Sequence, residues 1–201
     1  MRRILPLALL LAAAPARAGP FELHADLRAG AASGWGLGGD QKDNDFFDHT
    51  KGGSYGVLVG MRVLFFEASI EHDQFTDFSS VKGTWTELDA GIGIAIAVDD
   101  VLRGESNKLY VNVGFDLGAG FGTGRQISPP LDNAQISDKG VLVNAHIGIE
   151  YRILPFLALA AEFPAGWGYM LKNDVPANLD GSSYTTFHFM ILGAVRGRIG
   201  F

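Results

Sequence analysis

The stretch "PFELHADLRAG", residues 20–30, alternates apolar and ionisable side chains from Phe21 to Ala29. Every second position from Glu22 to Arg28 is ionisable, and the positions between them are apolar. Successive side chains of a β-strand point to opposite faces, so this pattern predicts a strand with one charged face and one apolar face. A soluble barrel buries its apolar face, whereas a membrane barrel turns that face outward. The remaining sequence has to decide between these two arrangements.

Seven further segments have the same alternation, and the clearest is "KLYVNVGFDLGAGFG" at 108–122. Its apolar positions run from Leu109 to Phe121 in unbroken alternation. Each segment has enough residues for a tilted membrane strand, which takes about 9–11. The fold class predicted is all-β, an eight-stranded antiparallel up-and-down transmembrane β-barrel. Its strands are expected at 20–35, 54–64, 65–75, 85–98, 108–122, 141–153, 156–169 and 184–201.

The composition of the 201-residue chain supports a strand protein in a membrane. Hydrophobic residues make up 47% of the chain, yet after residue 18 no apolar run exceeds nine residues ("ILPFLALAA", 153–161). A membrane-spanning helix needs about 20, so helical spans are excluded there. The 27 glycines also disfavour a helical protein, because glycine weakens helix interiors. The chain has no cysteine, which excludes disulfides and thiolate metal sites.

The N-terminus has the features of a secretory signal peptide. Arg2 and Arg3 precede an apolar run, and an A-x-A cleavage site ends at Ala18. Loss of this segment removes three arginines and leaves 13 basic and 22 acidic residues, a net charge of −9. Such a chain is an unlikely partner for nucleic acid, so no nucleic-acid partner is expected. The domains expected are a cleaved signal peptide, 1–18, and an outer-membrane β-barrel, 19–201.

Long and short connections alternate along the chain. The connections after the first, third, fifth and seventh predicted strands are long and polar, and those after the second, fourth and sixth are short. Outer-membrane barrels have long extracellular loops and short periplasmic turns. We therefore expect a protein of the bacterial outer membrane, in a Gram-negative-type envelope, with both termini periplasmic. The long connections are 36–53, 76–84, 123–140 and 170–183.

Aromatic residues gather near both ends of the predicted strands. Two aromatic belts are typical of a protein that crosses two membrane interfaces. A soluble barrel has no reason to sort its aromatics in this way, so the apolar face is predicted to be the outside. The belt near the long connections is expected to hold Trp35, Tyr55, Phe75, Trp85, Phe121, Trp167 and Tyr184, and the opposite belt Phe21, Phe66, Tyr151 and Phe201.

The chain ends "VRGRIGF", with Val195, Ile199 and Phe201 in phase. This ending resembles the assembly signal of bacterial outer-membrane barrels. The whole mature chain resembles the small eight-stranded barrels of the outer-membrane protein A, X and W type. The resemblance implies the fold and the location, and as partners the barrel-assembly machinery, periplasmic chaperones and outer-membrane lipids. Fold alone does not imply a function.

The inward face of the predicted barrel is rich in charge. An eight-stranded barrel is just wide enough to be filled by its own side chains, and buried charges need partners. Because the last strand closes on the first, Arg196 and Arg198 are expected near Glu22, and Arg62 is expected to pair with Glu67. The predicted lumen network comprises Glu22, His24, Asp26, Arg28, Arg62, Glu67, Glu71, Asp116, His146, Glu150, Arg152, Glu162, His188, Arg196 and Arg198.

Three functional hypotheses follow for such a barrel. The first is a structural or surface-interaction protein with a lumen plugged by polar side chains. The second is transport, through a small porin-like, cation-preferring pore or by a path for hydrophobic molecules. The third is an enzyme resembling lipid A deacylases, which would use His72 with Ser79 or Ser80, but no His-x-Ser pair ends a strand. No catalytic residue and no cofactor are therefore expected.

The first long connection, "GGDQKDNDFFDHTKGG" at 38–53, is acidic. Its spaced carboxylates, Asp40, Asp43, Asp45 and Asp48, are of the type that ligates Ca²⁺. The glycine and terminal glutamate of an EF-hand loop are missing, however. We expect a solvated acidic loop and no metal site.

Overall fold

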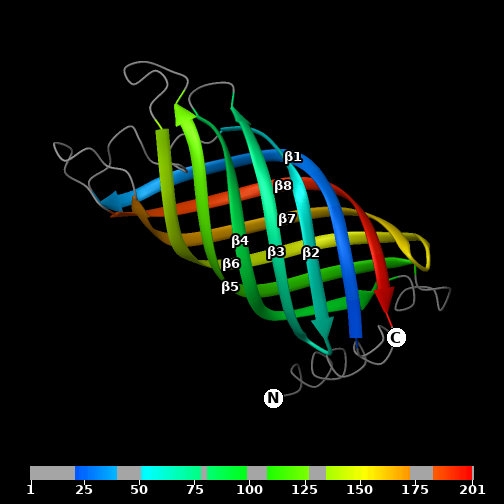
Figure 1. Cartoon of the computed structure of the whole chain (residues 1–201). Coiled ribbons are helices and arrows are strands. Elements are labelled where there is room, and N and C mark those ends of the chain that lie inside the picture. Colours follow the sequence, from blue (N-terminus) through cyan, green and yellow to red (C-terminus); the bar gives the residue numbers. More distant parts are fainter. Residues whose placement is uncertain are drawn as a thin grey trace.

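The computed structural model describes residues 21–39, 51–77, 81–98, 108–126, 135–172 and 183–200. In these residues eight antiparallel strands follow one another around a closed barrel, and the last pairs with the first (Figure 1). The predicted fold class is thereby confirmed. The strands are β1 (Phe21–Gly39), β2 (Lys51–Val63), β3 (Phe66–Asp77), β4 (Val81–Ala97), β5 (Leu109–Gln126), β6 (Gln135–Leu154), β7 (Leu157–Lys172) and β8 (Ser183–Gly200).

Some predictions fall on residues outside these ranges. They concern the signal peptide, most of the acidic connection at 38–53, the two serines at 79–80 and the terminal residue, Phe201. Within the described ranges, no helix is both long enough and apolar enough to cross a membrane.

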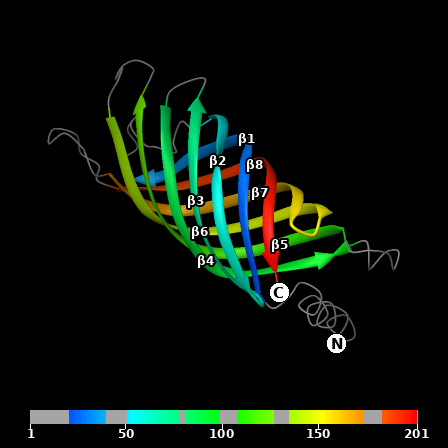
Figure 2. The same ribbon diagram turned by 45° about the vertical axis from the view of Figure 1, so that its right-hand side comes forward.

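Both ends of the described chain lie at one end of the barrel. Glu22 pairs with Gly200 across the seam between β1 and β8, and Phe21 pairs with Val63 beside the turn between β2 and β3 (Figures 1 and 2). This turn is tight, and its Leu64 has a φ of 59°. We call this end the turn end and the opposite one the loop end.

Several strands extend further toward the loop end than their apolar pattern predicted. β6, for example, begins at Gln135 rather than at 141. Backbone pairing requires no apolar side chain, so the ladder continues where outward positions become polar, as at Ser137 and Lys139. The apolar alternation therefore marks only the middle part of each strand.

The outward face of the barrel is apolar over this middle part. Leu27 is 67% exposed and Leu117 63%, although leucine is among the residues most often buried in soluble proteins. Every carboxylate whose side chain the structure describes lies at an inward position of its strand. The distribution of polar and apolar side chains is the reverse of that in a soluble barrel.

The belt assignments of Trp85 and Tyr184 are wrong, and so is that of Phe75. Trp85 is 2% exposed and Tyr184 1%, and both lie inside the barrel. The reason is alternation: Trp85 shares its strand face with Glu87, which also points inward. Their position near a strand end had suggested a belt. Of the other predicted belt residues with described side chains, Phe21 is half-buried and the rest are exposed: Trp35, Tyr55, Phe121 and Trp167 near the loop end and Phe66 and Tyr151 near the turn end.

Candidate functional site

The lumen near the turn end is filled by arginines and carboxylates that meet across the β8–β1 seam. Arg196 of β8 is opposite Asp26 of β1 in the ladder, and its Nε donates to Asp26 Oδ1 over 2.8 Å. The same guanidinium donates from Nη1 to Glu150 Oε2 over 3.0 Å and also bonds Glu162. One buried cation thus contacts carboxylates from three strands, β1, β6 and β7.

Glu150 is the acidic counterpart of Arg196. Besides Arg196, its carboxylate accepts hydrogen bonds from Arg152 Nε and from Arg198 Nη1, each over 2.7 Å. Arg198 also pairs with Glu22, as expected from the closure of the barrel. The Arg152 guanidinium lies 3.4 Å from the centre of the Tyr110 ring. We call this group of three arginines and four carboxylates the arginine cluster.

A second ion-pair group joins β1 and β3 over the inner face of β2, the strand between them. Arg28 Nε donates to Asp73 Oδ1 over 3.0 Å, and its Nη2 lies 2.8 Å from Glu71 Oε2. Gly56 of β2 stands between Arg28 and Asp73 in the ladder. A Cβ at Gly56 would clash with Asp73 and with the neighbouring backbone, so glycine there allows the side chains of β1 and β3 to meet over β2.

A third group lies over paired glycines of β4 and β5. Gly93 and Gly114 face each other, and a Cβ on either would clash with the Glu67 carboxylate. Above them, Glu67 Oε1 lies 3.4 Å from His146 Nε2, and His146 Nδ1 lies 3.1 Å from Asp116 Oδ2. Arg62 pairs with the other Glu67 oxygen over 3.1 Å, the pair that the sequence predicted.

The same three side chains are spaced for metal binding. One ligand atom each from Glu67, Asp116 and His146 lies within 4.8 Å of the others. Both imidazole nitrogens face carboxylates, and Arg62 already pairs with Glu67, so the arrangement holds together as a charge network. His146 contacts both carboxylates, and Arg62 supplies a counter-ion to Glu67.

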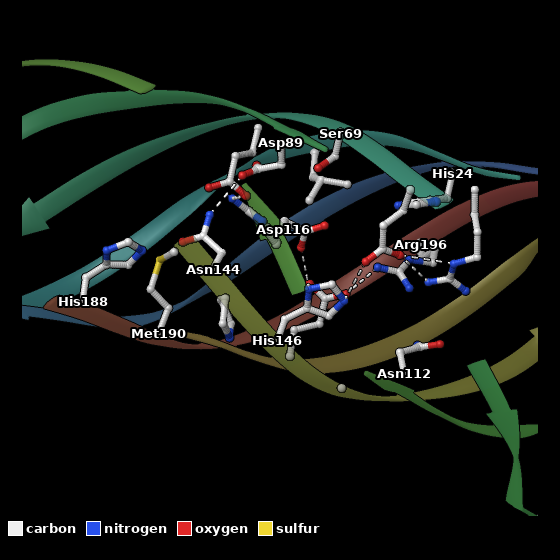
Figure 3. Close-up of a pocket in the computed structure, with 18 residues that line it drawn as sticks. His24, Ser69, Asp89, Asn112, Asp116, Asn144, His146, His188, Met190 and Arg196 are labelled. Atoms are coloured by element: carbon white, nitrogen blue, oxygen red, sulfur yellow. Dashed lines mark hydrogen bonds and ion pairs between the residues drawn. The ribbon is translucent and has the colours of Figure 1, made fainter. Parts of the chain in front are cut away.

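Between these groups is a small cavity of about 100 Å³ (Figure 3). A cavity needs about 10–15 Å³ of this kind of volume to hold one water molecule, so the space admits several waters. Glu71 and Glu87 are direct neighbours in the β3–β4 ladder. Asn144 donates from Nδ2 to Glu87 Oε1 over 2.6 Å and to Asp89 Oδ1 over 3.0 Å. The middle of the lumen is therefore acidic, and amide donors supplement the few cations.

The loop-end half of the lumen contains an apolar group that the sequence analysis missed. It includes Trp85, whose Nε1 donates to Glu87 Oε2 over 2.8 Å, and Tyr184, whose hydroxyl donates to Asp138 over 2.5 Å. The signal was present, because these apolar residues interrupt the polar series at inward positions. We call this group the apolar stopper: Ala32, Phe75, Trp85, Leu142, Met170, Tyr184, Met190 and Leu192.

The remaining predicted residues are placed as follows. His24 of β1 faces inward, with its Nδ1 4.0 Å from Glu22 Oε1, and His188 of β8 is buried at the cavity. His72 faces outward, and its Nδ1 lies 2.7 Å from Thr86 Oγ1. All fifteen residues of the predicted lumen network lie at inward positions, distributed over the groups above.

Comparison with known proteins yields similarity only at the level of structure. No protein-family model and no curated protein sequence matches the chain. Neisserial surface protein A is 13% identical over 90% of this chain and 97% of its own, with a TM-score of 0.53. The N-terminal barrel of Pseudomonas aeruginosa OprF is 13% identical over 87% and 98%, with a TM-score of 0.45. Ail of Yersinia pestis is 10% identical over 89% and 99%, with a TM-score of 0.42.

At these identities the similarity concerns the fold, and Neisserial surface protein A carries it. It agrees with the closed antiparallel order of the eight strands. The chain has the fold of the small eight-stranded bacterial outer-membrane barrels.

Proposed function

We propose that the protein is an integral outer-membrane barrel with a closed lumen, which presents its loop end at the cell surface for contact with other molecules. The observation that carries this proposal is the inverted barrel: apolar side chains outside, with an ion-paired and stoppered interior. A closed barrel satisfies its backbone hydrogen bonds internally, as the hydrocarbon core of a membrane requires.

The proposed orientation places the turn end in the periplasm. The two ends of the described chain, at Phe21 and Gly200, and the tight β2–β3 and β6–β7 turns share this end (Figure 1). Short turns on the periplasmic side and longer connections outside are the common arrangement of outer-membrane barrels. The β3–β4 connection departs from this pattern, because it spans only 78–80 instead of the predicted 76–84, whereas the turn-end β4–β5 connection spans 98–108. The segments that join β1 to β2, β3 to β4, β5 to β6 and β7 to β8 would then be extracellular.

Two barriers in series support a closed lumen. The arginine cluster occupies the turn-end half, where Arg196 bonds carboxylates from three strands. The apolar stopper occupies the loop-end half, and its Trp85 and Tyr184 rings are almost fully buried. An ion that entered the acidic cavity between them would have to lose its water shell against apolar side chains, which is costly.

Conductance of the refolded protein in planar lipid bilayers tests the closed state. We expect no current steps from the wild type, and steps from the triple variant Phe75→Ala/Trp85→Ala/Arg196→Ala, which removes two rings of the stopper and the central arginine of the arginine cluster. Trp167→Ala is the matched control, because Trp167 faces outward. Wild-type steps that disappear in Glu71→Gln or Asp116→Asn would contradict closure and favour the cation-pore alternative.

One observation favours a second candidate, a lateral path for hydrophobic molecules. The β7–β8 ladder runs to Glu162 and resumes at Ala165, so Phe163 and Pro164 are unpaired on that side. Proline has no N–H to donate, and such residues are rare inside a sheet. Pro164 and Met190 line the cavity at this break.

Entry of an apolar fluorescent dye into vesicles tests this candidate. If the break is a path, vesicles with wild-type protein take up the dye faster than empty vesicles, and Pro164→Ala slows uptake by restoring an N–H donor. Equal uptake by all three preparations would eliminate the path and leave the closed barrel.

A further inference from the structure

Among the outward strand positions whose side chains the structure describes, the charges are all of one sign and lie in one place. Among outward strand positions with described side chains, the charged residues are Lys82 on β4, Arg125 on β5 and Lys139 on β6. All three are exposed, and all three lie near the loop end of adjacent strands. The carboxylates whose side chains the structure describes are confined to inward positions, so none of them shares this surface.

The ladder places these cations in a compact grid. Lys82 is directly opposite Arg125, the Thr84–Thr123 pair follows on the same face, and Phe121 is opposite Lys139. The two threonine hydroxyls lie 3.4 Å apart. The grid thus combines three cations with hydroxyl donors on three neighbouring strands. We call it the cationic face: Lys82, Thr84, Thr86, Phe121, Thr123, Arg125, Ser137 and Lys139.

The Lys82–Arg125 pair is costly for the isolated barrel. Like charges directly opposite each other on one sheet face destabilise the ladder. If these charges served only for contact with water at the end of the barrel, they could lie on any of the eight strands. At the loop end of β8 and β1 the outward surface instead carries stacked aromatics, with Trp35 5.6 Å from the Phe189 ring centre. The concentration of cations on one side points to an anionic ligand there.

The surface directly below the cationic face is apolar. The next outward row toward the turn end is Leu88, Ala119 and Val141, and all three side chains are exposed. A ligand that covered both areas would need an anionic head and apolar chains. Such a ligand fits the boundary between the headgroups and the hydrocarbon of one membrane leaflet.

We propose that the cationic face binds the phosphate groups of lipid A, the phosphorylated glycolipid of the outer leaflet, with its acyl chains on the apolar row below. Lys82 and Arg125 contact one phosphate from adjacent strands, and the threonine and serine hydroxyls donate to its oxygens. Lys139, nearer the hydrocarbon, contacts a second anionic group. This inference rests on the proposed function, because it requires the loop end to be at the outer leaflet.

Native mass spectrometry of the refolded protein in detergent tests the site, with diphosphoryl lipid A and its dephosphorylated form as probes. We expect lipid A adducts on the wild type and none with the dephosphorylated lipid. Each cation near an anionic lipid surface contributes about fivefold, so Lys82→Gln/Arg125→Gln/Lys139→Gln should bind roughly 100-fold more weakly. The charge-conserving variant Lys82→Arg/Arg125→Lys/Lys139→Arg should keep the adducts.

Lys108→Gln is a control for loss of positive charge at the turn end, and it should bind like the wild type. The shift between heated and unheated bands on gels verifies that each variant is folded. Equal adducts on the wild type and the triple Gln variant, or equal binding of both lipids, would overturn the proposal. Cell fractionation of the wild type separately tests the outer-membrane location, so failure of the site and failure of the location are distinguishable.

Discussion

Replacement of Arg196 by glutamine is the most informative perturbation of the lumen. Arg196 is 6% exposed and bonds both oxygens of Asp26, besides Glu150 and Glu162. Removal of one partner from a buried ion pair costs about 3–5 kcal/mol, because the remaining charge is left uncompensated. Glu150 retains two arginines in the variant. The loss should therefore arise chiefly from Asp26, and we expect the free energy of unfolding to fall by about 3–5 kcal/mol.

Urea titration of the protein refolded in phospholipid vesicles measures this loss, with tryptophan fluorescence and the gel shift as independent probes. The second variant, Arg196→Gln/Asp26→Asn, removes the uncompensated charge and should recover about 1–3 kcal/mol. Arg152→Gln is the matched control. It removes a less buried arginine whose carboxylate partner, Glu150, keeps two other guanidiniums, so its cost should be about 1 kcal/mol.

The reasoning would be refuted by an Arg196→Gln variant no less stable than Arg152→Gln. It would also be refuted if neutralising Asp26 in the Arg196→Gln background lowered stability further. Either result would mean that the cluster is solvated well enough to keep its charges without partners.

Three further perturbations test the packing, each by urea titration in vesicles. Gly56→Ala should lower the free energy of unfolding by about 1–3 kcal/mol, because its Cβ would clash with β3, whereas outward Gly193→Ala should change it by less than 1 kcal/mol; equal effects would contradict this. Leu64→Gly should raise it by about 1 kcal/mol, since a side chain at a φ of 59° is strained, and a lower value would exclude strain. Trp85→Ala should lower it by about 3–5 kcal/mol through loss of the ring and its bond to Glu87; a loss below 1 kcal/mol would mean that the stopper is loosely packed.

The alternation of side chains was enough to predict the barrel and the face of almost every residue. Tyr151 and Arg152, for example, are assigned to opposite faces by parity alone, and the structure places them so. The odd or even position of a residue in its strand is a reliable guide here, because a shift of the strand register by one residue would turn all the charges of that strand toward the apolar exterior. The same rule places Trp85 on the inward face with Glu87. Its assignment to the outward aromatic belt was wrong because it rested on the position of Trp85 near the end of its strand instead of on the alternation.

The contacts within the lumen depend on information that alternation does not carry. Asp26 meets Arg196 because of the register across the β8–β1 seam, which depends on the closure of the whole barrel. The meeting of Arg28 with Asp73 depends on the glycine between them in the ladder. A single strand contains neither relation. The charge inventory of the lumen was therefore predictable, whereas most of its pairs were not.

The apolar stopper changes the view of how such a lumen closes. The alternation of side chains predicts a lumen closed by polar side chains alone, and the polar groups do occupy the turn-end half and the middle. Toward the loop end, however, apolar side chains such as Leu142 and Met170 fill the interior. The apolar stopper at the loop end would therefore oppose the passage of an ion, and the arginine cluster at the turn end would oppose the passage of an apolar molecule.

Quenching of tryptophan fluorescence by brominated acyl chains tests whether the outward face of the barrel contacts lipid. Two single-tryptophan proteins are compared after refolding in brominated vesicles, one keeping Trp167 and one keeping Trp85, with phenylalanine at the other two positions. Trp167 faces outward and Trp85 faces the lumen. The account predicts strong quenching of Trp167 and little quenching of Trp85. Equal quenching of the two, or emission from Trp167 unchanged by bromine, would show that the outward face of this barrel does not contact lipid.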